Sequence, residues 1–312
     1  MAQLPQRSLG VTGPEVSVVG LGCNNFGRRV DVSGTRAVVD AALDAGITFF
    51  DTSNTYGDPR GQSEEFLGEV LDGRRDQIVL ATKFGMDMGD GLGPRGSRAY
   101  VLQAIEASLR RLRTDVIDYY WYHQPDGVTP IAETLETLDG LVRAGTVRYI
   151  GASNFSAAQI EEADAVARER GFARFTAIQN NYSLLVRDAE RDVLPTCERL
   201  GLGFVPFFPL ASGLLTGKYR RGEPAPDGTR LAAREQVASD EQFDAVESLA
   251  RFAAARDVSM TDVAIGALLA KPVVSTVIAG ATEPSQVRSN VAAARWTPSE
   301  SDLAELERVL NP

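Results

Sequence analysis

The chain has 312 residues, 44% of them hydrophobic, and a formal net charge of −10. This length suits one large α/β domain, and the apolar share is typical of a folded protein. The acidic balance, without a run of Lys and Arg, argues against binding to nucleic acid or to anionic membranes. The first ten residues lack the apolar core of a signal peptide, and no run of about 18 apolar residues occurs, so we expect a cytoplasmic protein.

The cysteine and histidine counts limit which disulfides and metal sites the chain can form. Cys23 and Cys197 lie far apart, and two free thiols are expected, although their spacing alone leaves a disulfide open. His123 is the only histidine. Because a catalytic zinc usually takes two or three histidines, most histidine-based metal sites are excluded, and we expect no metal.

Short apolar runs recur along the chain. Most are continuous rather than alternating, which is typical of strands buried on both faces of a parallel sheet. The runs span residues 16–22, 47–53, 77–83, 115–123, 147–154, 175–182, 203–210 and 275–281.

Helical patterns separate these runs and continue beyond them. They span 34–46, 63–73, 97–112, 130–145, 156–171, 187–201, 240–256 and 260–270, and a further pair closes the chain. Ser63 is expected as a helix N-cap, and Pro195 weakens the sixth pattern.

The alternation of eight strands with helices predicts an α/β fold, a (β/α)₈ TIM barrel, with an open doubly wound sheet as the alternative. Residues 4–17, with Gly13-Pro14 between two short runs, predict an N-terminal β-hairpin that covers the barrel bottom. Residues 211–236 predict a long loop after the seventh strand. We expect residues 1–312 to form a single domain. The stretch GLGPRG at 91–96 has dinucleotide-binding spacing but follows no strand directly, so it is interpreted as a loop.

Polar side chains stand at consecutive strand ends, which meet at one mouth of a barrel. Asp51 ends the second strand, Tyr56 lies in the loop that follows, Lys83 ends the third strand and His123 ends the fourth. An ammonium group near a phenol lowers the phenol pKa, so Tyr56 could protonate a carbonyl oxygen while Asp51 holds Lys83. Each residue alone has an ordinary structural explanation. The four together predict a general-acid site.

The chain resembles the aldo-keto reductases along nearly its whole length. The resemblance rests on GITFFDTSNTYG, VLATKFG, DYYWYHQPD, VRYIGASNFS, AIQNNYSLL, FPLASGLLTGKY and VIAGATEPSQVRSN. It implies a (β/α)₈ barrel that reduces aldehydes or ketones to alcohols with NADP(H). It also implies a catalytic tetrad of Asp51, Tyr56, Lys83 and His123, in which Tyr56 is the proton donor.

The resemblance also implies a cofactor site at the later strand ends. Ser153, Asn154 and Gln179 would hold the nicotinamide, whose carboxamide suits such donors and acceptors, and Phe207 would stack on it. The other expected cofactor contacts are Gly22, Cys23, Asp51, Pro209, Leu210, Ser212, Gly213, Lys218, Arg230, Gly280, Thr282, Gln286 and Asn290. Many NADPH-specific relatives carry Lys or Arg at the positions of Gly280 and Gln286. Here both are uncharged and Glu283 lies between them, so NAD(H) use stays open.

Substrate contacts are expected at the loops after the first, second and fourth strands. The candidates are Asn24, Asn25, Phe26, Tyr56, Trp121, Tyr122 and His123. The expected partner is a small-molecule carbonyl compound, and the oligomeric state stays open. Because the family includes potassium-channel β subunits, a nucleotide-sensing regulatory subunit is the alternative function. A metal-dependent hydrolase is a third reading, against which the single histidine argues.

Overall fold

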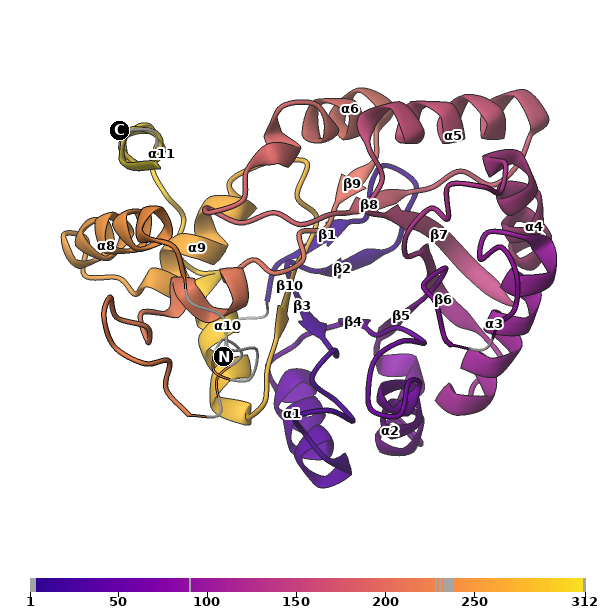
Figure 1. Ribbon diagram of the computed structural model, residues 1–312, viewed down its shortest axis with the longest axis horizontal. Helices are drawn as coiled ribbons and strands as arrows, with labels where there is room; N and C mark the ends of the chain where they lie inside the picture. The colour runs from indigo at the N-terminus through magenta and orange to yellow at the C-terminus, as the bar shows by residue number, and fades with distance from the viewer. Residues whose placement is uncertain (1–3, 90, 228, 230–231, 233–237, 311–312) are drawn as a thin grey trace.

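The computed structural model describes residues 4–89, 91–227, 229, 232 and 238–310. Eight parallel strands form one curled sheet in the order β10-β3-β4-β5-β6-β7-β8-β9, with the helices outside it (Figure 1). The strands are β3 (Val19–Gly22), β4 (Phe49–Asp51), β5 (Val79–Phe84), β6 (Ile117–Tyr122), β7 (Val147–Ser153), β8 (Ala177–Gln179), β9 (Gly203–Phe204) and β10 (Val277–Gly280).

The two edges of this sheet meet. Phe204 of β9 forms a parallel bridge with Val274, just before β10, and its N–H donates to the carbonyl of Val273 at 2.8 Å. Strand order follows chain order around the sheet, whereas a doubly wound sheet reverses direction at a switch point. The predicted (β/α)₈ barrel is confirmed, and the doubly wound alternative is wrong.

Ten α-helices of the described residues lie outside the barrel sheet. They are α1 (Val32–Asp44), α2 (Gln62–Val70), α3 (Arg98–Leu112), α4 (Ile131–Arg143), α5 (Ala157–Arg170), α6 (Val193–Leu200), α8 (Asp240–Ala254), α9 (Met260–Leu269), α10 (Pro284–Ala293) and α11 (Glu300–Leu310). Short 3₁₀ helices are η1 (Arg75–Gln77), η2 (Asp188–Glu190) and η3 (Ala211–Thr216).

Two predictions about the helices are wrong: the N-cap of α2 and the effect of Pro195 on α6. Helix α2 begins at Gln62 after Gly61, whose φ of 92° is left-handed, so Ser63 is not the N-cap. The Ser63 hydroxyl instead donates to the carbonyl of Cys23 at 2.9 Å. Pro195 does not interrupt α6, because it lies in the first turn, where a missing N–H breaks no helical hydrogen bond.

The N-terminal hairpin covers the amino-terminal end of the barrel, as predicted. Strands β1 (Gln6–Ser8) and β2 (Glu15–Ser17) pair antiparallel, and between them Leu9 is fully buried in the barrel interior. Gly10 has φ 76°, and a Cβ there would lie 2.2 Å from the carbonyl oxygen of Thr176. Only glycine therefore allows the hairpin to approach the strand starts this closely.

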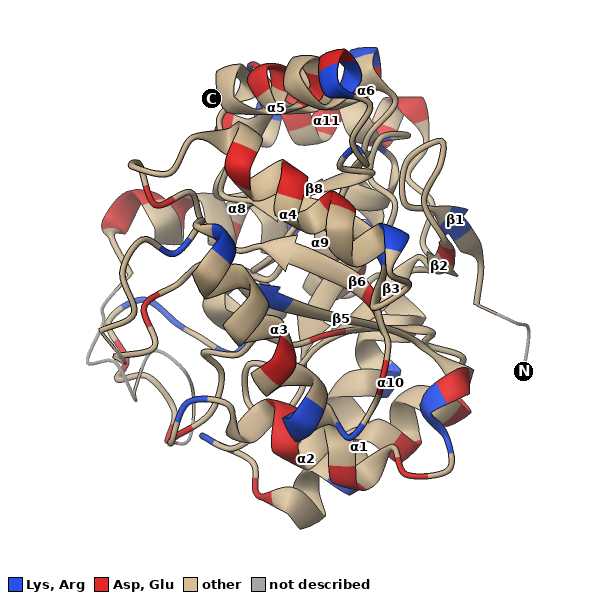
Figure 2. Ribbon diagram, turned by 90° about the vertical axis from the view of Figure 1, so that its right-hand side faces the viewer, with Lys and Arg blue, Asp and Glu red and all other residues tan. Residues whose placement is uncertain are grey.

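The main hydrophobic core lies between the sheet and the helices. Another cluster fills the barrel interior and includes Tyr119 and Trp121, whose ring centroids are 4.3 Å apart. Cys23 and Cys197 are buried free thiols, which confirms that prediction. Acidic and basic residues are interspersed along the outer helices (Figure 2). Among the described helices, none is long and apolar enough to cross a membrane.

Candidate active site

The strand ends bring the predicted tetrad together. In the sheet register Gly22 lies beside Asp51, Lys83 lies beside Trp121, and Ser153 lies beside Gln179. Asp51 is the last residue of β4, Lys83 is one residue from the end of β5, and His123 directly follows β6. Because the strands are parallel, these side chains gather at the carboxyl-terminal mouth of the barrel.

Lys83 and Asp51 form a buried ion pair. Their side chains are 0% and 2% exposed, and the ammonium donates to Oδ2 of Asp51. Oδ1 of Asp51 accepts from Nε2 of Gln179 at 3.0 Å. The indole N–H of Trp121 also favours the charged carboxylate without reaching full hydrogen-bond geometry. Burial raises the pKa of Asp51, and the charge of Lys83 opposes this only in part.

The ammonium of Lys83 uses all three of its protons. Besides Asp51, it donates to the carbonyl of Thr52 at 2.8 Å and to the phenol oxygen of Tyr56 at 3.3 Å. Burial alone would disfavour its charge, but Asp51 and Tyr56 outweigh that effect, so the pKa of Lys83 lies above its ordinary value. An ammonium cannot accept a hydrogen bond. Tyr56 must therefore accept from Lys83, and its own proton is available to another partner.

The resting pKa of Tyr56 differs from the sequence prediction. Burial raises it above its ordinary value, and the lowering effect of Lys83 is smaller. The phenol is therefore protonated at neutral pH. Lys83 does act on the phenol in the predicted direction, and its Nζ lies 4.9 Å from the ring centroid.

His123 lies edge-on to Tyr56, with ring centroids 6.0 Å apart at 87°. Its Nδ1 lies 3.2 Å from Oγ of Ser53. Burial and then the charge of Lys83 hold the pKa of His123 well below its ordinary value, so the ring is neutral near pH 7. The carbonyl of His123 accepts from Nδ2 of Asn154 at 2.9 Å, which ties the fourth strand end to the fifth.

An outer layer of hydrogen bonds fixes the strand ends to α2. Thr52 and Ser63 share a hydrogen bond of 2.9 Å, and Thr82, next to Lys83, donates to the fully buried Glu64 at 2.5 Å. Glu64 in turn accepts from Nε of Arg111 at 2.7 Å. These bonds hold the strand ends in place from outside the barrel.

The predicted nicotinamide residues lie beside the tetrad. Ser153 and Gln179 are buried, and Asn154 is exposed with φ 59°. Nδ2 of Asn154 lies 3.2 Å from Oγ of Ser153. A hydroxyl and two amides at adjacent strand ends match the donors and acceptors of a carboxamide, so this donor set fits a nicotinamide.

The segment after β9 has several left-handed backbone conformations. Phe208, Ala211, Ser212 and Gly213 all have positive φ, at 55°, 46°, 58° and 98°. Left-handed conformations in non-glycine residues are strained and cluster at ligand sites, and turns of this kind direct N–H groups toward anions. Of the predicted pyrophosphate contacts, Pro209 is buried, Leu210, Ser212 and Gly213 are half-buried and Lys218 is exposed. Phe207 is half-buried against the barrel cluster. Arg230 lies outside the described residues.

Gly22 and Gly280 face one another across strands β3 and β10. A Cβ on Gly280 would lie 3.4 Å from Oδ1 of Asn24 and 3.2 Å from Nδ2 of Asn25, so the predicted substrate and cofactor residues meet here. At the start of α10, Oε1 of Gln286 accepts from the backbone of Thr282 at 2.9 Å. Asn290 is buried on the inner face of the same helix.

Two of the predicted substrate residues have no exposed surface. Phe26 packs in the main core and Trp121 in the barrel interior, and both are 0% exposed. A cavity of about 410 Å³ lies instead among the loops after β5 and β6. It is lined by residues that include Leu92, Arg95 and Val128, and Arg60 from the Tyr56 loop donates to the carbonyl of Asp87 in its wall at 2.5 Å.

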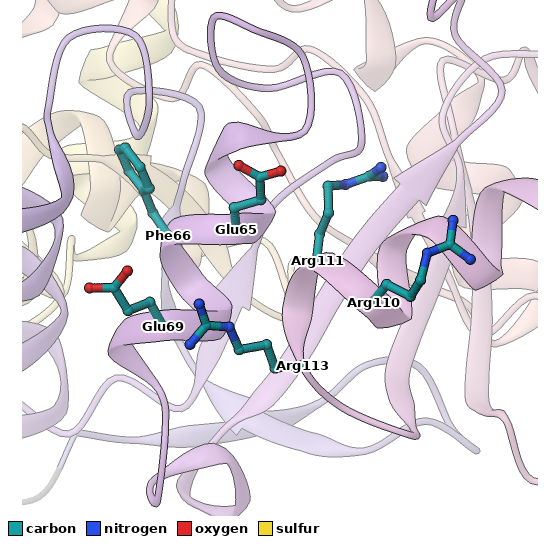
Figure 3. Close-up of a pocket in the computed structure, with 6 residues that line it drawn as sticks. All are labelled: Glu65, Phe66, Glu69, Arg110, Arg111 and Arg113. Atoms are coloured by element: carbon teal, nitrogen blue, oxygen red, sulfur yellow. The ribbon is translucent and has the colours of Figure 1, made fainter.

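A separate cavity of about 400 Å³ lies between α2 and α3, and Figure 3 shows the side chains that line it. It is lined by Glu65, Phe66, Glu69, Arg110, Arg111 and Arg113. None of the predicted site residues lines it. Two of its charged side chains have structural partners, because Arg111 pairs with Glu64 and Glu69 pairs with Arg36 at 3.6 Å.

Sequence reasoning missed Ser53 and Thr52. Thr52 contributes its backbone carbonyl to Lys83, and any residue type would supply that group. Ser53 has a signal in the sequence, because it lies two residues after Asp51, and alternate residues of an extended chain face the same side.

Known proteins resemble this chain along nearly its whole length. The sequence model of the aldo/keto reductase family matches residues 18–311. "Uncharacterized oxidoreductase YrpG" of Bacillus subtilis is 38% identical over 91% of this chain and 89% of its own length. A "Probable voltage-gated potassium channel subunit beta" of rice is 35% identical over 92% and 90%. "L-glyceraldehyde 3-phosphate reductase" of Escherichia coli is 32% identical over 98% and 92%.

The fold and these residues define a (β/α)₈ barrel with a polar site at the carboxyl ends of its strands. The chain belongs to the aldo/keto reductase family. Membership supports a general oxidoreductase role with a nicotinamide cofactor.

Proposed function

We propose that this chain reduces aldehydes or ketones to alcohols, with NADP(H) as cofactor and NAD(H) as the alternative. The observation that carries the proposal is the Asp51–Lys83–Tyr56 chain of hydrogen bonds at the barrel mouth. When bound, the nicotinamide supplies a hydride. Ser153, Asn154 and Gln179 would hold it, and the loop from Phe208 to Gly213 would approach its phosphates.

The tetrad suits protonation of a carbonyl oxygen. Tyr56 is protonated at neutral pH, as a phenol ordinarily is, and burial raises its pKa further. Lys83 already donates to the phenol oxygen, so it stabilises the negative charge that develops there as the proton leaves. Asp51 keeps Lys83 charged and in position. General-acid catalysis of this kind contributes roughly 10²–10⁴-fold.

His123 and the rim of the barrel would orient the substrate. A neutral imidazole can donate one hydrogen bond to the carbonyl oxygen that Tyr56 protonates. Asn24, beside Gly280, lies where the expected cofactor and substrate sites meet. The cavity near Leu92 and Val128 would receive the substituent of a larger aldehyde, since both side chains are exposed and apolar.

The test replaces Tyr56 by phenylalanine. Loss of the proton donor should lower turnover of a reactive aromatic aldehyde by at least about 100-fold. Oxidation of NADPH or NADH is followed by absorbance, and cofactor binding, followed by tryptophan fluorescence, should stay nearly unchanged. Tyr119→Phe is the matched control, because the hydroxyl of this buried tyrosine lies 2.7 Å from Oγ1 of Thr176, just before β8, rather than near Lys83. Full activity of Tyr56→Phe would refute the assignment.

A second function follows from the rice relative, whose name describes a channel subunit. Clear nucleotide binding by the wild-type chain without turnover of any aldehyde, with either cofactor, would favour a nucleotide-sensing regulatory subunit.

A further inference from the structure

Ser53 is a buried side chain that contacts the predicted tetrad and has no assigned role. It is 0% exposed, and its hydroxyl oxygen lies 3.2 Å from Nδ1 of His123. Nδ1 is thus turned toward Ser53, and Nε2 occupies the far edge of the ring. Within the part of the chain that the structure describes, Nε2 has no hydrogen-bond partner.

The partners of Ser53 determine where its proton goes. A hydroxyl has one proton to donate and two lone pairs to accept with. The backbone N–H of Thr55 donates to Oγ of Ser53 at 3.3 Å, and the Thr55 hydroxyl lies 3.0 Å from the same oxygen. If Thr55 fills both lone pairs, the proton of Ser53 is directed to Nδ1. Asn54 Oδ1 is a competing acceptor at the longer distance of 3.4 Å.

The ring of His123 carries a single proton near pH 7, because burial and the charge of Lys83 lower its pKa. In a neutral imidazole one nitrogen donates and the other accepts. An acceptor at Nδ1 therefore means a donor at Nε2. The opposite tautomer would present a lone pair at Nε2, which repels a carbonyl oxygen.

We propose that Ser53 is a positioning residue that holds His123 in the tautomer with its proton on Nε2, ready to donate to a substrate oxygen. Thr55 supports this role by occupying the lone pairs of Ser53. The catalytic role of this tautomer rests on the proposed function, but the tautomer itself can be measured without substrate or cofactor.

The single histidine makes the measurement direct. Labelling the whole chain with ¹⁵N-histidine gives the signals of His123 alone, and a long-range ¹H–¹⁵N correlation separates a protonated ring nitrogen from an unprotonated one. We expect Nδ1 unprotonated and Nε2 protonated in the wild-type chain at neutral pH. Protonated Nδ1 would overturn the proposal, and this arm does not depend on any variant folding.

The variant Ser53→Ala tests whether Ser53 is the cause. Loss of one neutral hydrogen bond should shift the tautomer ratio about fivefold toward Nδ1–H. Ser17→Ala is the matched control, because Ser17 is an equally buried serine in the hairpin at the opposite end of the barrel, where its hydroxyl donates to the carbonyl of Val19. Its His123 spectrum should match that of the wild type. An unchanged spectrum in Ser53→Ala would overturn the proposal.

Turnover separates this inference from the proposed function. In Ser53→Ala the kcat should fall by up to about tenfold, as expected when a functional histidine loses an orienting partner, while cofactor affinity stays unchanged. A shifted tautomer with undiminished kcat would overturn the positioning role. An inactive wild-type chain that keeps the expected tautomer would overturn the proposed function and with it the catalytic purpose of the contact, while the contact itself would stand.

Discussion

Replacing Asp51 by asparagine should destabilise the protein by stranding a buried charge. Lys83 is 0% exposed and would lose its charged partner, while the carbonyl of Thr52 and the phenol of Tyr56 would remain as neutral partners. Removing one partner of a buried ion pair typically costs about 3–5 kcal/mol. The amide oxygen of asparagine could still accept from Lys83, so we expect a loss near the lower end, about 3 kcal/mol in the free energy of unfolding.

The loss should also depend on pH. In the variant, burial of Lys83 would no longer be opposed by Asp51, so its pKa in the folded state would fall below the unfolded value near 10.4. Folding would then favour the neutral amine, and the variant would regain stability as pH rises toward that unfolded value. Urea unfolding at pH 7 and at pH 9.5 measures both effects.

Two controls isolate the stranded charge. Asp244→Asn removes a carboxylate from an exposed ion pair with Arg221, so it should cost at most about 1 kcal/mol. Adding Lys83→Met to Asp51→Asn should restore most of the stability, because a neutral replacement of a buried pair is often tolerated. A loss below about 1 kcal/mol in Asp51→Asn at pH 7 would refute the reasoning.

The remaining predictions concern His123 and cofactor choice. Since the folded pKa of His123 is lowered, unfolding gains a proton below about pH 6.5, and stability should fall by up to about 1.4 kcal/mol per pH unit of acidification. His123→Gln should remove this pH dependence. If urea unfolding gave the same dependence of stability on pH for the variant and the wild type, the prediction would be contradicted. Glu283, exposed at the N-cap of α10, should repel a 2′-phosphate, so Glu283→Gln should improve NADPH binding about fivefold relative to NADH, from roughly 1 kcal/mol of Coulomb energy. Arg230→Ala should weaken binding of NADPH more than binding of NADH. If titrations of either variant changed the two affinities equally, that residue would not belong to the 2′-phosphate site.

The sequence by itself determined the barrel and the composition of its mouth. Continuous apolar runs such as 77–83 predict strands buried on both faces, because only a covered parallel sheet can bury both sides. Asp51, Lys83 and His123 could be placed together for the same reason: parallel strands share one carboxyl edge. The N-terminal hairpin was also predictable, since Gly13-Pro14 is a local turn signal.

Only the tertiary structure decided how these groups behave. The pKa of Tyr56 depends on the balance between burial and the charge of Lys83, and burial is a property of the whole fold. Phe26 was predicted as a substrate contact at the barrel mouth but lies in the core, because a strand-end loop can turn its side chain either way. Ser63 suited an N-cap but bonds to Cys23 instead. The contact between Ser53 and His123 depends on the directions in which their two side chains turn at the barrel mouth, and the strand pattern does not specify these directions.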